Sequence, residues 1–205
     1  ENPARGKEPS NIKAVGAYLF KQAFFSYYSG LSRHHEADFI DAINWYLKEK
    51  IGSLVRLPGD VPALKYPWEL FFVLDTLFES PYFQPGTASS ARIGANVVME
   101  GQVYVGENAV IRANCVIEGP AYIGPGCEIG CNNVLRGSVN LEQNVKTGAF
   151  CEIKHSILQE GTHAHSGYFG NSIIGSNCRF GAGFVSANRR IDRETVLCEV
   201  NGKKL

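Results

Sequence analysis

Large aliphatic residues recur at every sixth position through much of the second half of the chain. Ten of the eleven positions counted in sixes from residue 93 to residue 153 carry one, and small residues often follow four positions later. In such a repeat three short strands form one triangular coil of about 18 residues, and coils stack about 4.8 Å apart. The pattern predicts a left-handed parallel β-helix filled by these side chains. They are Ile93, Met99, Val105, Ile111, Ile117, Ile123, Ile129, Leu135, Leu141 and Ile153, with Thr147 as the exception.

Residues 1–85 have a different pattern. Residues 36–50 carry apolar side chains on one helical face, and Pro67 begins an apolar run that predicts a second helix over residues 67–79. Residues 11–20 and 51–57 are rich in β-forming side chains and predict strands. We therefore expect a small, mixed α/β region before the β-helix.

Composition changes near residue 90. Sixteen of the 23 aromatic residues lie before this point, whereas 16 of the 22 glycines and all six cysteines follow it. Residues 86–92 fall in a stretch rich in Pro, Gly and Ser that is typical of a linker. We predict an α/β domain over residues 1–85, a linker over 86–92 and the β-helix over 93–205.

Charge and hydropathy exclude several classes of protein. Lys plus Arg and Asp plus Glu number 20 each, so neither a nucleic-acid surface nor an acidic tail is indicated. The sequence contains neither an apolar run of membrane-spanning length nor a signal-peptide pattern. We expect a cytoplasmic protein that binds neither nucleic acid nor membranes. Because Glu1 comes first and Met99 is the only methionine, we also expect that sequence is missing upstream.

Four of the six cysteines fit the repeat. Cys115, Cys127 and Cys151 occupy the small inward position, and Cys178 does so in a later register. No C-x-x-C occurs. Small buried side chains explain these positions better than disulfide, metal or redox chemistry.

The repeat is interrupted after residue 153. The six-residue register returns three residues out of phase at Tyr168, and we expect residues 159–167 to bulge outward and expose His163 or His165. The break could equally be a plain insertion with solvated histidines. A metal site is not expected, because no third ligand accompanies the two histidines.

Two cations lie near this break. Arg136 and Lys154 are separated by one full coil of the repeat, so they should stack on one face in adjacent coils. Beside a histidine they would form a corner suited to a phosphate. The alternative is a solvated ladder of surface charges.

The segment "TGAFCEIKHSILQEGTHAHSGYFGNSIIGSNCRFGAGFVSANRRID", residues 147–192, carries E-x-K, H-x-x-Y-x-G, G-A-G and A-N in that order. It resembles the acetyltransferase β-helix of the bifunctional N-acetylglucosamine-1-phosphate uridylyltransferase/glucosamine-1-phosphate acetyltransferase family, which serves UDP-N-acetylglucosamine biosynthesis. Residues 1–20, "FIDAI" and "LKYPWEL" look like the end of the nucleotidylyltransferase domain of that family. The resemblance implies a chain truncated at both ends.

The resemblance also implies roles for individual residues and partners. Acetyl-CoA would be the co-substrate, an amino-sugar 1-phosphate the acceptor, and the active site would lie between the subunits of a homotrimer. His165 matches the catalytic base if one residue is deleted before it, and Asn188 and Glu152 match residues that arrange the site. The sugar-phosphate contacts match Arg136, Lys154 and Tyr168.

Three departures from the family pattern qualify these roles. Arg179 replaces a substrate-contacting asparagine and could add an anion contact or block the sugar. Asn2 and Ala63 replace a lysine and a metal-binding aspartate of the nucleotidylyl site, so we expect no nucleotidyl transfer by this chain. The leading hypothesis is an acetyltransferase. The alternatives are a non-catalytic trimerising β-helix, or a fragment of a nucleotidylyltransferase whose activity lies upstream.

Overall fold

The structure is a computed structural model that describes residues 7, 15–32, 35–57, 61, 64–186, 189–200 and 202–204. The chain divides into two compact units, Glu1–Val61 and Pro62–Leu205. Within the described residues, none of the helices has the length and apolarity needed to cross a membrane.

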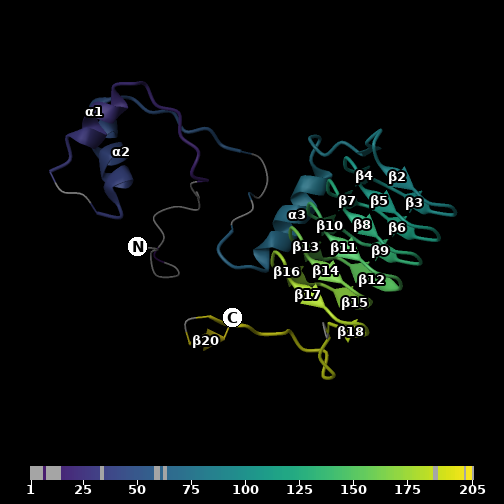
Figure 1. Cartoon of the computed structure of the whole chain (residues 1–205). Coiled ribbons are helices and arrows are strands. Elements are labelled where there is room, and N and C mark those ends of the chain that lie inside the picture. Colours follow the sequence, from purple (N-terminus) through teal and green to yellow (C-terminus); the bar gives the residue numbers. More distant parts are fainter. Residues whose placement is uncertain are drawn as a thin grey trace. The chain divides into compact units, whose positions relative to one another are not determined.

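The second unit is a parallel β-helix of three six-stranded sheets (Figure 1). Each coil contributes one short strand to each sheet, as the six-residue period predicts. In spatial order sheet A contains β1 (Gly86–Thr87), β4 (Val103–Val105), β7 (Ala121–Ile123), β10 (Val139–Leu141), β13 (Ile157–Leu158) and β16 (Ile173–Ile174). Sheet B contains β17 (Arg179–Phe180), β14 (His163–Ala164), β11 (Lys146–Thr147), β8 (Glu128–Ile129), β5 (Val110–Ile111) and β2 (Arg92–Ile93). Sheet C contains β18 (Phe184–Val185), β15 (Gly167–Gly170), β12 (Cys151–Lys154), β9 (Val134–Arg136), β6 (Val116–Glu118) and β3 (Val98–Glu100).

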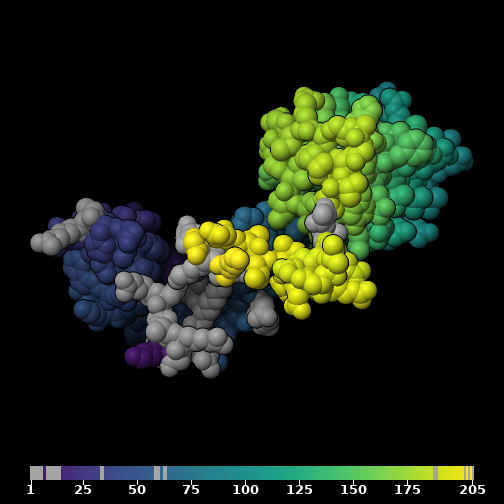
Figure 2. Space-filling model, turned by 90° about the horizontal axis from the view of Figure 1, so that it is seen from below, coloured from purple at the N-terminus to yellow at the C-terminus, as the bar shows by residue number. Residues whose placement is uncertain are grey.

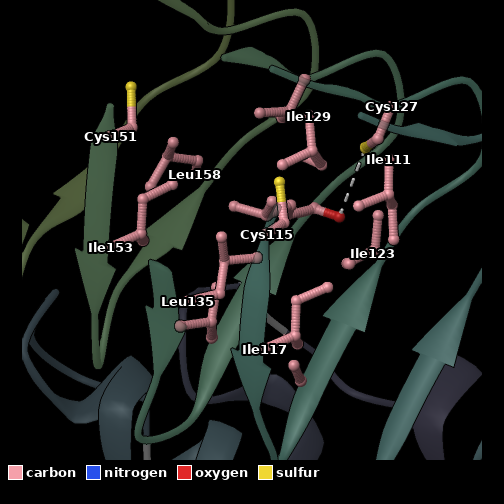
Figure 3. Close-up of a cluster of buried hydrophobic side chains, with 14 of the residues drawn as sticks. Ile111, Cys115, Ile117, Ile123, Cys127, Ile129, Leu135, Cys151, Ile153 and Leu158 are labelled. Carbon is pink, nitrogen blue, oxygen red and sulfur yellow. Dashed lines mark hydrogen bonds between the residues drawn. The ribbon is translucent and has the colours of Figure 1, made fainter. Parts of the chain in front are cut away.

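The interior of the prism is built from the residues that carry the period. Ile117, Leu135 and Ile153 stack in successive coils of sheet C and are fully buried. Figure 3 shows these side chains meeting those of the other two sheets across the interior. Burial of such a side chain contributes about 1.5–3 kcal/mol, so the aliphatic stacks supply the main stabilisation of the fold.

The small inward position is confirmed for three cysteines. Cys115, Cys127 and Cys151 are buried beside the aliphatic stacks (Figure 3), and all six cysteines are free thiols. Cys127 Sγ donates to the carbonyl of Glu142 at 3.0 Å. Desolvation by burial raises the pKa of the Cys127 thiol to about 11, which keeps it protonated and inert.

The interruption of the repeat is a set of shortened corners. Val116 and Val134 pair across one full coil of the repeat, whereas Ile153 pairs with Phe169, which comes two residues sooner than a full coil would place it. Each of the steps from Ile153 to Leu158, from Ala164 to Phe169 and from Phe169 to Ile174 is one residue short of six. Three deletions at corners thus produce the phase shift.

Two predictions about this segment are therefore wrong. Residues 159–167 do not bulge outward: His163 and Ala164 form β14, which pairs with β11 and β17 on either side. Phe169, and not Tyr168, is the residue that enters the core, where it is fully buried against Phe180 and Phe184. When a corner is one residue shorter, a different residue of the next strand faces the core, but the backbone stays within the coil.

The β-helix begins earlier than predicted. Residues 86–92, expected to form a linker, contain β1 and the first residue of β2. Ser89 and Ser90 form the turn between β1 and β2, and turns share the composition of linkers. The α-helix α3 (Glu69–Glu79) belongs to the same unit and covers sheet A, where Leu74 and Phe78 pack against Ile157 (Figure 1).

The later coils and the last residues complete this unit. Figure 2 shows the surface of the later coils in yellow-green. The rings of Phe169, Phe180 and Phe184 have centroids about 5 Å apart and connect the last two coils. An antiparallel pair, β19 (Glu199–Val200) and β20 (Lys203–Lys204), follows.

The described residues of the first unit contain two helices, α1 (Phe24–Ser29) and α2 (Asp38–Glu49). Phe24, Ala42 and Tyr46 form its core, and Phe20 stacks on Phe24 with 3.8 Å between ring centroids. The helix predicted over residues 36–50 is confirmed. The strand predicted over residues 51–57 is not observed, and residues 15–20 of the strand predicted over 11–20 form no sheet either, because no neighbouring strand in the described part of this unit offers backbone partners. Residues 11–14 lie outside the described residues.

Candidate functional site

A groove of about 400 Å³ runs along the outer face of sheet B. It crosses four strands, β8, β11, β14 and β17, and reaches the corner that follows β14. Its walls therefore combine side chains from four coils. The lining residues are Glu128, Lys146, Thr147, Gly148, His163, Ala164, His165, Arg179 and Phe180.

His165 stands at the edge of this groove, on one of the three short corners. Its backbone N–H donates to the carbonyl of Phe180 at 3.0 Å, while its side chain is exposed. Gly148 lies at the matching corner of the preceding coil, and a Cβ there would sit 2.1 Å from the His165 carbonyl oxygen. The missing Cβ lets the two corners stack closely, so the backbone of His165 is fixed while its imidazole remains accessible.

The inner side of this corner is held by a buried amide. Asn133 Nδ2 donates to Thr147 Oγ1 at 2.7 Å and to the carbonyl of Gly148 at 3.0 Å, and its Oδ1 accepts from the N–H of Cys151. Asn133 is fully buried, and all its polar atoms are satisfied. The network connects the corner beneath His165 to the first residue of β12.

Four polar side chains stack at one register position on sheet B. Glu128 pairs with Lys146, Lys146 with His163, and His163 with Arg179 along β8, β11, β14 and β17. Lys146 Nζ lies 2.5 Å from a carboxylate oxygen of Glu128, and this hydrogen bond lowers the pKa of Glu128. We call these four residues the sheet-B ladder.

Arg179 and His163, the last two residues of the sheet-B ladder, are joined by a hydrogen bond between a guanidinium and an imidazole. A guanidinium N–H of Arg179 donates to Nδ1 of His163 at 2.5 Å. The pKa of His163 is lowered, first by burial and then by the positive charges of Arg179 and Lys146, against the opposing influence of Glu128. His163 is therefore a neutral imidazole at physiological pH.

Sheet C carries a second polar cluster. Arg136 donates to one carboxylate oxygen of Glu152 from Nε at 2.9 Å and from a terminal nitrogen at 2.6 Å. This contact, and less strongly the neighbouring Tyr168, raises the pKa of Arg136. Lys154 stacks on Arg136 in the next coil, as predicted, and Tyr168 pairs with Glu152. We call these four residues the sheet-C cluster.

The predicted site residues thus fall into two groups within one chain. The sheet-C cluster contains Arg136, Glu152, Lys154 and Tyr168, whereas His165 and Arg179 line the groove on sheet B. His165 precedes the first residue of β15, whereas Lys154 ends the neighbouring strand β12 and pairs with the last residue of β15. Within one chain the structure therefore does not place His165 beside the two cations. Asn188, Asn2 and Ala63 lie outside the described residues.

Three residues of the ladder in the groove, Glu128, Lys146 and His163, were not predicted from the sequence to lie together. Glu128 and Lys146 are separated by one full coil, so the repeat length alone could have paired them. His163 follows Lys146 one residue sooner than a full coil would place it, and Arg179 follows His163 two residues sooner, so the short corners concealed the place of His163 in the ladder. Among the described residues, no group of three or more His, Cys, Asp or Glu side chains is placed to hold a metal ion.

Comparison with known proteins relates this fold to a family. A model described as "Bacterial transferase hexapeptide (six repeats)" matches residues 88–119. The bifunctional protein GlmU of Methanocaldococcus jannaschii is 35% identical over 212 residues, which cover 100% of this chain and 50% of that protein. The GlmU of Methanococcus maripaludis is 39% identical over 210 residues, covering 99% and 49%.

A third relative carries a more descriptive name. The bifunctional sugar-1-phosphate nucleotidylyltransferase/acetyltransferase of Sulfurisphaera tokodaii is 33% identical over 200 residues, covering 96% of this chain and 49% of that protein. The chain is thus similar, over nearly all of its length, to these bifunctional proteins. The predicted resemblance is confirmed, and the chain spans about half the length of the curated relatives that it matches.

Proposed function

We propose that the β-helix transfers an acetyl group from acetyl-CoA to the amine of an amino-sugar 1-phosphate, such as glucosamine 1-phosphate. The observation that supports this most directly is His165, an exposed imidazole on a backbone that is fixed by its neighbours and borders a groove of about 400 Å³. A groove of this size suits a small organic molecule. The bifunctional relatives, one of which is named an acetyltransferase, favour acyl transfer over other chemistry.

The chemistry requires a base near the attacking nitrogen. As the sugar amine attacks the thioester carbonyl, the new N–C bond forms and the C–S bond breaks. His165 in its neutral form accepts the proton that the amine loses, and the departing sulfur takes up a proton to leave as a thiol. A base of this kind contributes about 10²- to 10⁴-fold in rate, and an imidazole is well matched to neutral pH.

The sheet-C cluster would hold the sugar phosphate. Arg136 and Lys154 stack on one face and supply two positive charges, and Tyr168 supplies a hydroxyl from the next coil. Because His165 and Lys154 lie at opposite ends of two neighbouring strands in one chain, we propose that a homotrimer completes the site by placing the cluster of one subunit beside the groove of the next. Holding the acceptor in this way fixes its amine close to the thioester.

A thiol-release assay with acetyl-CoA and glucosamine 1-phosphate tests the proposal. We expect sugar-dependent release by the purified chain and at least about 100-fold slower release by His165→Ala. His35→Gln, which changes a histidine of the first unit, is the matched control and should be unaffected. Release that is independent of both the sugar and His165 would refute acetyl transfer and favour a non-catalytic trimerising β-helix.

Nucleotidyl transfer is not expected from this chain. The purified protein should release no pyrophosphate from UTP and a sugar 1-phosphate. Pyrophosphate release that depends on both substrates would contradict this expectation and would favour the nucleotidylyltransferase alternative.

A further inference from the structure

The hydrogen bond between Arg179 and His163 fixes the proton on the imidazole. A guanidinium carries only donors, so the Nδ1 atom that accepts from Arg179 must be unprotonated. The single proton of the neutral ring is then on Nε2. His163 therefore presents an N–H donor beside the remaining N–H groups of Arg179.

The charges along the groove favour an anion at this end. Glu128 is the one acidic residue among those that line it, and it is paired with Lys146. Arg179 stands two rungs beyond Lys146, about 10 Å along the stack at the usual strand spacing. Among the described residues Arg179 takes part in no ion pair with a carboxylate. Arg179 therefore contributes a net positive charge at its end of the groove.

His165 lies on the same side of the prism as His163 and Arg179. It borders the groove together with His163 and Arg179, and the corner that carries it follows directly on the strand that carries His163. A ligand whose reacting group reaches His165 would extend along the ladder past the two donors. The groove, at about 400 Å³, has room for more than one small functional group.

We propose that Arg179 and His163 form an oxyanion-binding subsite in this groove, which holds a phosphate or carboxylate group of the ligand that reaches His165. Arg179 supplies the charge and a planar pair of donors, and His163 supplies a neutral Nε2–H donor. This arrangement suits a planar or tetrahedral oxyanion because charge-assisted hydrogen bonds to arginine are among the strong ones. The subsite is separate from the sheet-C cluster. It rests on the proposed function only in taking His165 as the reacting end of the groove.

Binding of simple anions tests the subsite without any need for catalysis. Inorganic phosphate and acetate are titrated into the protein labelled with ¹⁵N in histidine, and the imidazole signals of His163 are followed by NMR. We expect phosphate to shift these signals saturably. Arg179→Gln should weaken the fitted affinity at least about tenfold, whereas Arg179→Lys should retain part of it.

The chain offers a matched control for the arginine. Arg92 occupies the same register column of sheet B, paired with Val110 below Glu128, and lies outside the groove. Arg92→Gln should therefore leave the phosphate affinity unchanged within about twofold. If phosphate and acetate fail to move the His163 signals, or if Arg179→Gln binds like the unaltered protein, the subsite does not exist.

Two further comparisons identify which ligand supplies the oxyanion. If CoA provides it, 3′-dephospho-CoA should bind more weakly than CoA, and Arg179→Gln should abolish the difference. If the acceptor provides it, glucosamine 1-phosphate should be favoured over glucosamine in the same Arg179-dependent way. These binding measurements stand apart from the thiol-release assay, so anion binding without acetyl transfer would refute the proposed function and leave the subsite in place.

Discussion

Arg136 and Glu152, which lie diagonally across adjacent strands of sheet C, are joined through a single carboxylate oxygen of Glu152. Both side chains are somewhat less than half exposed, so the pair lies partly in solvent. Glu152 holds the guanidinium in place and also cancels one of the two positive charges of the sheet-C cluster. The cluster is therefore ordered before any ligand arrives, at the expense of part of its attraction for an anion.

Glu152→Gln should separate these two effects. The variant retains a carbonyl oxygen for Arg136 but loses the negative charge, so the net charge of the cluster rises from about +1 to +2. We expect inorganic phosphate to bind the cluster more tightly, by about three- to tenfold at low salt, with the gain reduced at high salt. The signal of the Arg136 Nε–H group in NMR titrations reports this affinity. A weaker affinity in the variant would show that Glu152 acts only by positioning Arg136.

Asn133→Ala should destabilise the β-helix. The truncation leaves the carbonyl of Gly148 and the N–H of Cys151 without their buried partner, while the hydroxyl of Thr147 keeps the N–H of Gly130. Each unsatisfied group costs about 1–3 kcal/mol, so we expect a loss of at least about 2 kcal/mol in the free energy of unfolding measured in urea. Asn140→Ala, on the outward side of β10, is the control and should change it by less than about 1 kcal/mol.

Phe169→Ala tests the register of the shortened coils. Phe169 is fully buried, so its truncation should cost about 3–5 kcal/mol. Phe150→Ala is the matched control, because that ring is 70% exposed and its loss should cost little. If Tyr168→Ala were the more destabilising change in urea denaturation, the inward position would have been assigned to the wrong residue.

The lowered pKa of His163 predicts a dependence of stability on pH. In the unfolded chain the imidazole takes up a proton near its ordinary value of 6.5, whereas in the folded chain protonation requires a lower pH. The unfolded state therefore binds more protons in the window below about 6.5, so stability is full above this value and falls as the pH decreases through the folded pKa. His163→Gln should flatten this part of the curve of unfolding free energy against pH. If the slope of unfolding free energy against pH were the same in His163→Gln, the pH dependence would come from other groups.

The cysteines should differ sharply in reactivity. Cys127 is buried, and its raised pKa leaves almost no thiolate near pH 8, whereas Cys198 is exposed. Iodoacetamide should modify Cys198 in the folded protein within minutes. Cys115, Cys127 and Cys151 should react only after denaturation, as followed by mass spectrometry of peptides. Rapid labelling of Cys127 in the folded state would contradict its place in the core.

Much of the β-helix could be predicted from the sequence because its core is periodic. Each inward residue from Val105 to Ile153 follows the previous one by six, and the stacking in the structure confirms that spacing. The prediction failed where corners changed length. A corner contributes no side chain to the core, so the hydrophobic pattern does not report how many residues it contains. In the described part of the first unit, residues 15–20 and 51–57 form no strand for another reason: β-forming side chains do not form a strand without a neighbouring strand.

The candidate site was harder to predict than the fold. Arg136 and Lys154 could be paired because the coil between them has the full length of the repeat. His163 and Arg179 could not, since the coil between them is two residues short. A hydrogen bond between an arginine and a neutral histidine also depends on rotamers and on local burial, which no spacing rule contains.

The shortened corners allow the residues at the edge of the prism to change without a change in the packing of its interior. A single deletion in a globular core alters packing throughout the surrounding layers, but here inward-facing side chains continue to fill the prism on both sides of His155, His165 and Asn171 while its edge is rebuilt. The functional groups presented at an edge can therefore be exchanged one residue at a time, while the scaffold keeps its shape. For a protein of this architecture, corner length is a variable on which new specificities can be selected or engineered.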